Sequence, residues 1–239
     1  MAAAYALEKH VAIAAVSRAC GLTASVFKKL VNTETVIKGD ESPVTVADIS
    51  AQATINTILG SAFPDDPIIG EEDTSDLRLD TEPSRLLRER IVQLANDALR
   101  TYTGGAKGRM WTLDPIDGTK GFLRGEQYAV CLALIVDSVV QVGVMGCPNL
   151  PLEGHSASGE RGCLFVAVRG QGAEQRPLSA PFSSTTKISI PPLAPGAAPH
   201  LLESVESGHS SHTFSARFPK LLGSPHRLYE WIVKQNIAN

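Results

Sequence analysis

The sequence predicts a protein that combines helices with a sheet, of the α+β or α/β class. Apolar residues recur at helical spacing from about Leu7 to Leu30 and again over residues 45–63, where Gly60 is the expected end of the second helix. Short apolar segments typical of buried strands lie at Ile68–Ile69 and at residues 110–114. Two longer apolar segments fill residues 128–147, so helices come first and strands follow.

The strand predictions continue toward the C-terminus. A hairpin turn is expected at Asp137-Ser138, between the two longer strands. Residues 148–162 are read as a loop, 163–168 as a strand and 169–175 as a turn. A further helix is plausible over Pro83–Leu99, because proline is favoured in the first turn of a helix.

Length and composition indicate a globular protein. The 239 residues are 43% hydrophobic, which suffices for one large domain or two small ones. We expect an N-terminal domain over 1–150 that carries the functional site, and a partial C-terminal domain over 151–239. The net charge of −3 comes from 22 basic and 25 acidic residues, and the basic ones are dispersed. This balance argues against nucleic acid or a membrane surface as the main partner. The expected partner is a small-molecule substrate, and the protein is expected to be a monomer.

The cysteines and the N-terminus indicate a cytoplasmic protein. The four cysteines are far apart in the sequence and include no CxxC pair, so neither a disulfide framework nor a zinc site is expected. The apolar N-terminal segment carries Glu8, Lys9, His10 and Arg18, and its uncharged run is too short to span a bilayer. It is read as an amphipathic helix.

Acidic residues occur at three points where predicted elements begin or end. Asp48 lies near the start of the second helix, Glu71 and Glu72 follow one strand, and Asp114 and Asp117 follow another. Strand ends share one rim of an α/β sheet, and carboxylates that converge there repel each other unless a cation is bound. Oxygen ligands favour a hard divalent ion, and Mg²⁺ is the first candidate. Each cluster alone is more often a helix cap or a solvated turn, and only their joint occurrence favours a metal site.

The segment from Asp114 to Thr119 combines two kinds of ligand. The Pro-Ile bend allows the carbonyl of Ile116 to turn toward a metal. Gly118 and Thr119 can present backbone N–H groups to a phosphate at the start of a short helix. One tight loop then supplies metal ligands and phosphate donors, which suits metal-assisted phosphate hydrolysis.

Four segments resemble the 3′(2′),5′-bisphosphate nucleotidases, which are lithium-sensitive, magnesium-dependent phosphatases related to inositol monophosphatase. They are "PVTVADISAQ", "FPDDPIIGEED", "WTLDPIDGTKGFLRGEQYAVCLALI" and "GVMGCPNLP". The "DPIDGT" core is typical of the superfamily, whereas "GTKGFLRGEQYAV" and the later "HSSH" favour the nucleotidase branch. The resemblance extends from about Ala3 to Leu222.

The resemblance implies roles for individual residues. The pair that orients and deprotonates the attacking water would be Asp48 and Thr119. The expected metal ligands are the side chains of Glu71, Asp114 and Asp117 and the carbonyl of Ile116. The expected substrate contacts are Gly118, Thr119 and His209, the first two to the scissile phosphate and the last to the nucleotide.

The resemblance also implies a fold and a reaction. The fold is a layered αβαβα sandwich, with 163–168 in a second sheet that would be incomplete, because the likeness stops at about Gly223. The chain is therefore expected to be a C-terminally truncated or alternatively spliced form, or the product of a mistaken gene model. The implied reaction is Mg²⁺-dependent removal of the 3′-phosphate from adenosine 3′,5′-bisphosphate, and also from 3′-phosphoadenylyl sulfate. Two alternatives stay open, an inositol phosphate phosphatase and an inactive remnant.

Overall fold

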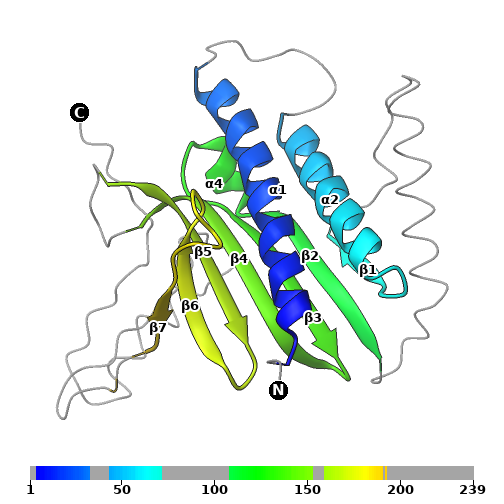
Figure 1. The fold of residues 1–239 in the computed structure, drawn as a ribbon. Coiled ribbons are helices and arrows are strands. Elements are labelled where there is room, and N and C mark those ends of the chain that lie inside the picture. The colour runs from blue at the N-terminus through cyan, green and yellow to red at the C-terminus, as the bar shows by residue number, and fades with distance from the viewer. Residues whose placement is uncertain (1–3, 33–42, 72–107, 153–158, 191, 193–239) are drawn as a thin grey trace, which may run out of the picture. The chain divides into compact units, whose positions relative to one another are not determined.

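The computed structural model describes residues 4–32, 43–71, 108–152, 159–190 and 192. Two long helices come first in the chain, and the strands follow, with one short helix between the second and the third strand (Figure 1). The helices are α1 (Ala6–Asn32), α2 (Pro43–Ala62) and α4 (Thr119–Leu123). The strands are β1 (Ile68–Gly70), β2 (Arg109–Asp117), β3 (Ala129–Val136), β4 (Val139–Pro151), β5 (Arg161–Val168), β6 (Gly172–Pro177) and β7 (Thr186–Ile188).

In the described part of the chain, seven strands form one sheet in the order β1 to β7. β1 lies parallel to β2, and every other neighbouring pair is antiparallel. The mixed sheet with its helices confirms the α+β class. The segment 163–168 is not in a second sheet, because β5 pairs with β4 over six positions from Val142↔Val168 to Cys147↔Cys163.

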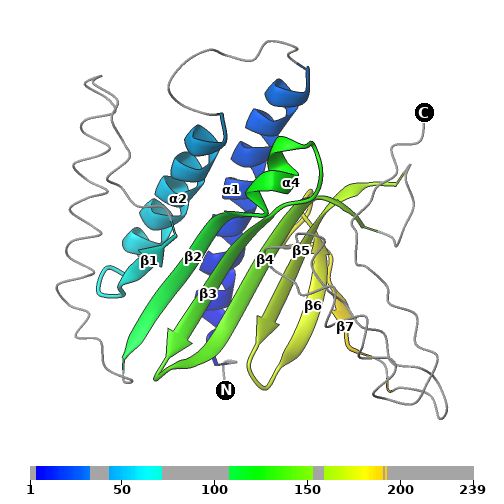
Figure 2. The ribbon, with the colours of Figure 1, turned by 180° about the vertical axis from the view of Figure 1, so that it is seen from behind.

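The helices α1 and α2 pack on the same face of the sheet, and the other face is turned away from them (Figures 1 and 2). Buried positions in α1 recur at helical spacing, as in Ala12, Val16 and Ala19. They meet the alternate residues of the strands that face the helices, such as Leu134 and Val144. By length and composition, residues 6–28 of α1 are apolar enough to cross a membrane, but in this fold the helix buries its apolar stripe against the sheet.

Most element boundaries follow the expectations. The hairpin between β3 and β4 turns at Asp137 and Ser138 as expected, and their φ angles of 49° and 62° are those of a tight primed turn. Four boundaries differ from the expectations. Gly60 does not end α2, which continues to Ala62, and Pro43 opens this helix instead of lying in the loop before it. The strand β4 continues beyond Cys147 to Pro151, and β6 already begins at Gly172, where a turn was expected. The helix expected over 83–99 lies outside the described residues.

The domain division expected at residue 150 stays a prediction. The chain divides into one compact unit over Met1–Ile188 and a second over Ser189–Asn239. All of the helices and strands named above belong to the first unit.

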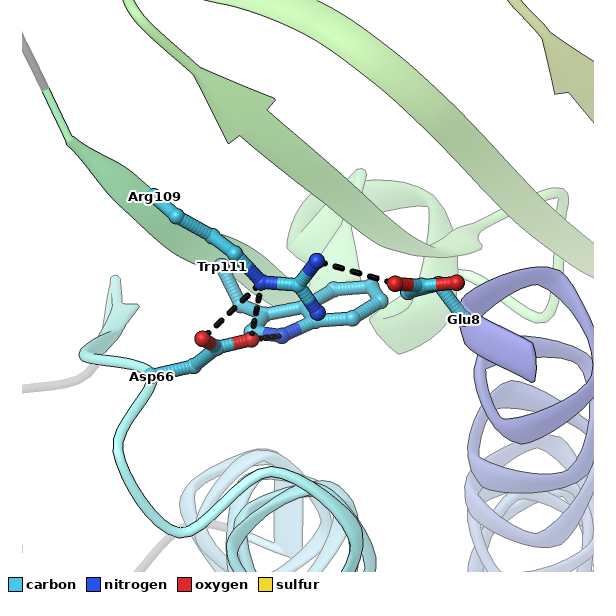
Figure 3. Close-up of polar contacts among 4 residues, drawn as sticks. All are labelled: Glu8, Asp66, Arg109 and Trp111. Carbon is cyan, nitrogen blue, oxygen red and sulfur yellow. Dashed lines mark hydrogen bonds and ion pairs between the residues drawn. The ribbon is translucent and has the colours of Figure 1, made fainter. Parts of the chain in front are cut away.

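A polar network joins three separate parts of the fold at the start of β2 (Figure 3). The Nε of Arg109 donates to both carboxylate oxygens of Asp66, at 2.9 and 2.7 Å, and its Nη1 donates to Glu8 at 2.9 Å. The indole Nε1 of Trp111 donates to the same Asp66 carboxylate at 2.9 Å. Phe63 stacks on Trp111 and lies under the Arg109 guanidinium. The network therefore ties α1 and the loop before β1 to the first residues of β2.

Because this network holds β1 beside β2, we predict that Asp66→Asn destabilises the protein. The neutral amide cannot accept all three hydrogen bonds, and the free energy of unfolding is expected to fall by about 1–3 kcal/mol. Urea denaturation measures the change. Asp65→Asn is the matched control, because Asp65 is exposed, and it is expected to stay within about 0.5 kcal/mol of the parent. Equal stability of the two variants would contradict the role given to Asp66.

Candidate functional site

The parallel pairing of β1 with β2 brings two acidic residues together. The register aligns Ile68 with Trp111 and Gly70 with Leu113, and the Glu71 N–H donates to the Leu113 carbonyl at 3.0 Å. The next residues along both strands, Glu71 and Asp114, are therefore neighbours, and their side chains share a hydrogen bond. The predicted convergence of these two carboxyl groups is found in the structure.

The surroundings of Asp114 favour its protonated form. Burial raises the pKa of Asp114 to about 7, with further contributions from the hydrogen bond and charge of Glu71 and from the charge of Asp117. The N–H of Ile116 donates to Asp114 Oδ1 at 3.1 Å and acts in the opposite direction. A bound cation would oppose this rise, because it offsets the repulsion between the carboxylates.

A bulge in β2 explains why two aspartates three residues apart share a face. Asp114 lies opposite Cys131 and Asp117 lies opposite Ala129, so three steps on β2 match two steps on β3. Since Cys131 and Ala129 point to the same side of the sheet, Asp114 and Asp117 do as well. The Pro-Ile pair between them supplies the extra residue, and Ile116 is buried on the helix side.

The turn after Asp117 depends on glycine. Gly118 has φ 91° and ψ 42°, a left-handed conformation that disfavours other residues, and α4 begins at Thr119. A side-chain carbon on Gly121 would overlap with the carbonyl oxygen of Gln127, so α4 also lies tightly against the chain that leads into β3. The first N–H groups of any helix lack intrahelical acceptors, which leaves the start of α4 suited to an anion.

The carbonyl of Ile116 and the side chain of Thr119 lie close together. The Thr119 hydroxyl donates to this carbonyl at 3.3 Å, near the long end of the range for a hydrogen bond. The two groups that the sequence assigned to the metal and to the attacking water are therefore neighbours on one turn.

Asp48 is buried in α2, with only 4% of its surface exposed. Its neighbour Ala47 packs with Ile116, Phe122 and Tyr128 in a small apolar cluster. This cluster places the first half of α2 over the turn between β2 and α4. The structure thus brings Asp48 to the same end of the sheet as Glu71 and Asp114, whereas His209 lies outside the described residues.

Sequence analysis missed two residues of this region, Gln52 and Cys131. Gln52 lies one helical turn after Asp48 and contacts Gly70, immediately before Glu71. Cys131 lies opposite Asp114, and its thiol is 4.0 Å from Asp117 Oδ2. The spacing of four residues from Asp48 could have identified Gln52, but no sequence pattern specifies the register that brings Cys131 to Asp114.

The cysteines are unsuited to nucleophilic chemistry. All four are free, and burial is the largest cause that raises the pKa of each. The pKa of Cys131 reaches about 12, with added contributions from Asp117 and Asp114. Because the reactive form of cysteine is the thiolate, these side chains remain inert thiols near neutral pH.

An open groove of about 660 Å³ runs along the sheet face opposite α1 and α2. Glu71 and Asp114 line it at β1 and β2, and Met145 and Phe165 line it at β4 and β5. The acidic pair therefore lies on an accessible face rather than in a closed core.

The donor set fits a hard divalent cation, although the structure does not complete a ligand shell. Glu71 and Asp114 supply adjacent carboxyl oxygens, and the charges of Glu71 and Asp117 contribute to the raised pKa of Asp114. Among the described residues, no three His, Cys, Asp or Glu side chains come together as a metal-binding group. The pair is therefore a partial site that needs further oxygen ligands.

Comparison with known proteins identifies the family to which this chain is related. The profile of the inositol monophosphatase family matches residues 3–224. A 3′(2′),5′-bisphosphate nucleotidase from Schizosaccharomyces pombe is 38% identical over 90% of this chain and 68% of its own length. Enzymes of the same name from Emericella nidulans and Arabidopsis thaliana are 40% and 38% identical, each over 92% of this chain and over 72% and 70% of their own lengths.

Solved structures show the same fold at lower identity. CysQ from Bacteroides thetaiotaomicron, a bacterial member of the inositol monophosphatase family, matches with a TM-score of 0.57 and 21% identity. The match covers 94% of this chain and 72% of that one. Mycobacterium tuberculosis SuhB matches with a TM-score of 0.53 and 18% identity, over 91% of this chain and 64% of that one.

The raised pKa of Asp114 predicts an unusual stability profile for the metal-free protein. The folded state holds a proton on Asp114 up to about pH 7, whereas an unfolded aspartate loses it near pH 4, so ionisation destabilises the fold as pH rises between these values. Asp114→Asn removes this loss and is expected to melt higher than the parent at pH 8, with the difference shrinking toward pH 4.

Thermal unfolding in EDTA at several pH values measures this effect, with Asp65→Asn as the control for an exposed carboxylate. A lower melting temperature of Asp114→Asn at pH 8 would show that the Asp114 carboxylate is not electrostatically strained.

Proposed function

We propose that this chain, which belongs to the inositol monophosphatase family, is a Mg²⁺-dependent 3′(2′),5′-bisphosphate nucleotidase. It removes the 3′-phosphate of adenosine 3′,5′-bisphosphate to give AMP and phosphate, and it acts in the same way on 3′-phosphoadenylyl sulfate. The observation that carries the proposal is the Glu71–Asp114 pair, followed on the same strand by the left-handed turn at Gly118. The names of the relatives support the choice of a nucleotide over other phosphate esters.

The acidic residues would hold the metal. Glu71, Asp114 and Asp117 offer carboxylate oxygens, and the carbonyl of Ile116 offers a neutral one. Mg²⁺ bound there supplies positive charge that offsets the charge of the phosphate and lowers the pKa of water. Asp114 must lose its proton to become a ligand, so metal binding is favoured as pH rises toward 7 and above.

Asp48 and Thr119 orient and deprotonate the attacking water. The Thr119 hydroxyl donates to the Ile116 carbonyl at 3.3 Å. This hydrogen bond is long, so the hydroxyl can turn to a stronger acceptor. Asp48 accepts the proton that water passes through the Thr119 hydroxyl. Its burial in α2 keeps bulk water from competing for that proton.

Backbone groups hold the scissile phosphate. Gly118 and Thr119 present N–H groups where the left-handed turn leads into α4. These donors stabilise the negative charge of the transferring phosphoryl group. His209 contacts the nucleotide, and it is the one proposed site residue that lies outside the described residues.

The proposal extends to the setting of the enzyme. We place it in the cytoplasm as a monomer that acts on a soluble nucleotide, with Mg²⁺ as its cofactor. The family also contains enzymes named for inositol monophosphate, so an inositol phosphate is the second candidate substrate.

We predict that the purified protein releases phosphate from adenosine 3′,5′-bisphosphate only when Mg²⁺ is present. Phosphate release is measured with this nucleotide, with 3′-phosphoadenylyl sulfate, with inositol monophosphate and with inositol 1,4-bisphosphate. The nucleotides are expected to have the higher kcat/KM. Asp114→Asn is expected to lower kcat by about 100-fold or more, because it removes a charged ligand from the cation site.

Preference for an inositol ester would replace the proposed substrate while leaving the metal site in place. Turnover that is unchanged in EDTA or in Asp114→Asn would contradict the metal site itself.

We further predict that Li⁺ inhibits the enzyme. Li⁺ is close to Mg²⁺ in size but carries half its charge, so at the oxygens of Asp117 it would stabilise the developing charge poorly. Initial rates at fixed Mg²⁺ and increasing Li⁺ measure this, with K⁺ at equal ionic strength as the control. Asp117→Asn is expected to weaken Li⁺ inhibition, and unchanged inhibition in that variant would place the Li⁺ site elsewhere.

A further inference from the structure

Gln52 lies between α2 and the end of β1, and sequence analysis gave this residue no role. It lies on α2 four residues after Asp48, so the two side chains are stacked on one face, about 6 Å apart along the helix axis. Both are buried, at 4% and 6% exposure. The helix thus carries a carboxylate and an amide, one turn apart, into its interface with the sheet.

The amide of Gln52 lies directly against Gly70. A side-chain carbon on Gly70 would overlap with the Oε1 and Cδ atoms of Gln52 and come within 2.9 Å of its Nε2. Gly70 does not have a positive φ, so its backbone tolerates any residue. The reason for glycine at position 70 is therefore the space that the Gln52 amide occupies.

Gly70 is the last residue of β1, and Glu71 follows it. The Gln52 amide is consequently one turn from Asp48 on α2 and lies against the residue that precedes Glu71. The Glu71 side chain itself points to the opposite face of the strand, toward the groove. A glutamate of the same shape would add a third carboxylate to this region, whereas an amide fills the space, carries no net charge and can both donate and accept hydrogen bonds.

Resting on the proposed function, we propose that Gln52 is a positioning residue that fixes the spacing between Asp48 on α2 and Glu71 at the end of β1. Its amide contacts the strand end at Gly70, so that the water-activating carboxylate and the metal-binding carboxylate keep one separation. Small errors in such a separation are costly for turnover, because a misplacement of about 1 Å can reduce a rate about 100-fold.

The first test replaces the amide and keeps the volume. Gln52→Met retains the length of the side chain but has no amide donor or acceptor. We expect it to lower kcat by at least about 10-fold and to weaken Mn²⁺ binding, measured by the electron paramagnetic resonance signal of free Mn²⁺, while KM for the nucleotide changes less than about twofold. A merely structural role would leave Mn²⁺ affinity and kcat at the values of the parent, and that result would overturn the proposal.

The matched control is Asn56→Leu. Asn56 is the next buried polar residue on the same face of α2, one turn further from Asp48, at 8% exposure. This variant changes stability but is expected to leave Mn²⁺ affinity and kcat within about twofold of the parent. If Asn56→Leu impairs both as strongly as Gln52→Met does, the effect is not specific to Gln52 and the proposal fails.

A second pair of variants decides the question if Gln52→Met does not fold. Gly70→Ala forces the amide away from the strand, and Gln52→Ala/Gly70→Ala removes the overlap by shortening the side chain. We expect both variants to bind Mn²⁺ more weakly than the parent, because neither has an amide at the end of β1. Recovery of parental Mn²⁺ affinity in the double variant would show that Gln52 only fills space. Gly60→Ala is the control for adding a methyl group, since nothing lies within 4 Å of that position.

The Mn²⁺ readout separates this inference from the proposed function. If the parent binds Mn²⁺ but hydrolyses no nucleotide, the proposed substrate fails, while the comparison of Mn²⁺ affinities still decides the role of Gln52.

Discussion

The parallel pairing of β1 with β2 is the constraint on which the site depends. This pair places Glu71 next to Asp114, and a shift of one residue would turn one of the two carboxylates to the opposite face. Three residues of β1 offer few hydrogen bonds to hold that register. The Asp66 carboxylate supplies what the short strand lacks, because it holds Arg109 and Trp111 at the start of β2 and lies just before β1. A structural ion pair at one end of the sheet thereby supports the chemistry at the other.

The site is built at the expense of local stability. The bulge between Asp114 and Asp117 interrupts the β2–β3 ladder, Gly118 has a left-handed backbone, and Asp114 is held close to like charges. Each feature is unfavourable for an isolated fold, and each serves the binding of a cation and a phosphate. Such local conflict is expected at functional sites, where binding rather than folding sets the geometry.

Local patterns predicted the elements, and long-range pairing decided the rest. Helical spacing gave α1 and α2, and Asp137-Ser138 gave the hairpin, because these signals lie within one stretch of chain. Gly60 was taken for a helix end because glycine often ends helices, whereas α2 continues to Ala62, directly before Phe63, which stacks on the distant Trp111. The tie between Asp66 and Arg109, and the contact of Gln52 with Gly70, join residues far apart in the sequence, so no local pattern announces them. The acidic residues were found by their order, but which carboxylates touch required the register.

The central claim is that the β1–β2 pair ends in a cation site. A crystal structure of the protein soaked in Mn²⁺, with data collected at the manganese absorption edge, tests it most directly. The account predicts an anomalous peak within about 2.5 Å of carboxylate oxygens from both Glu71 and Asp114. An ordered Mn²⁺ bound elsewhere, with Glu71 and Asp114 still hydrogen-bonded to each other and no peak between them, would contradict it.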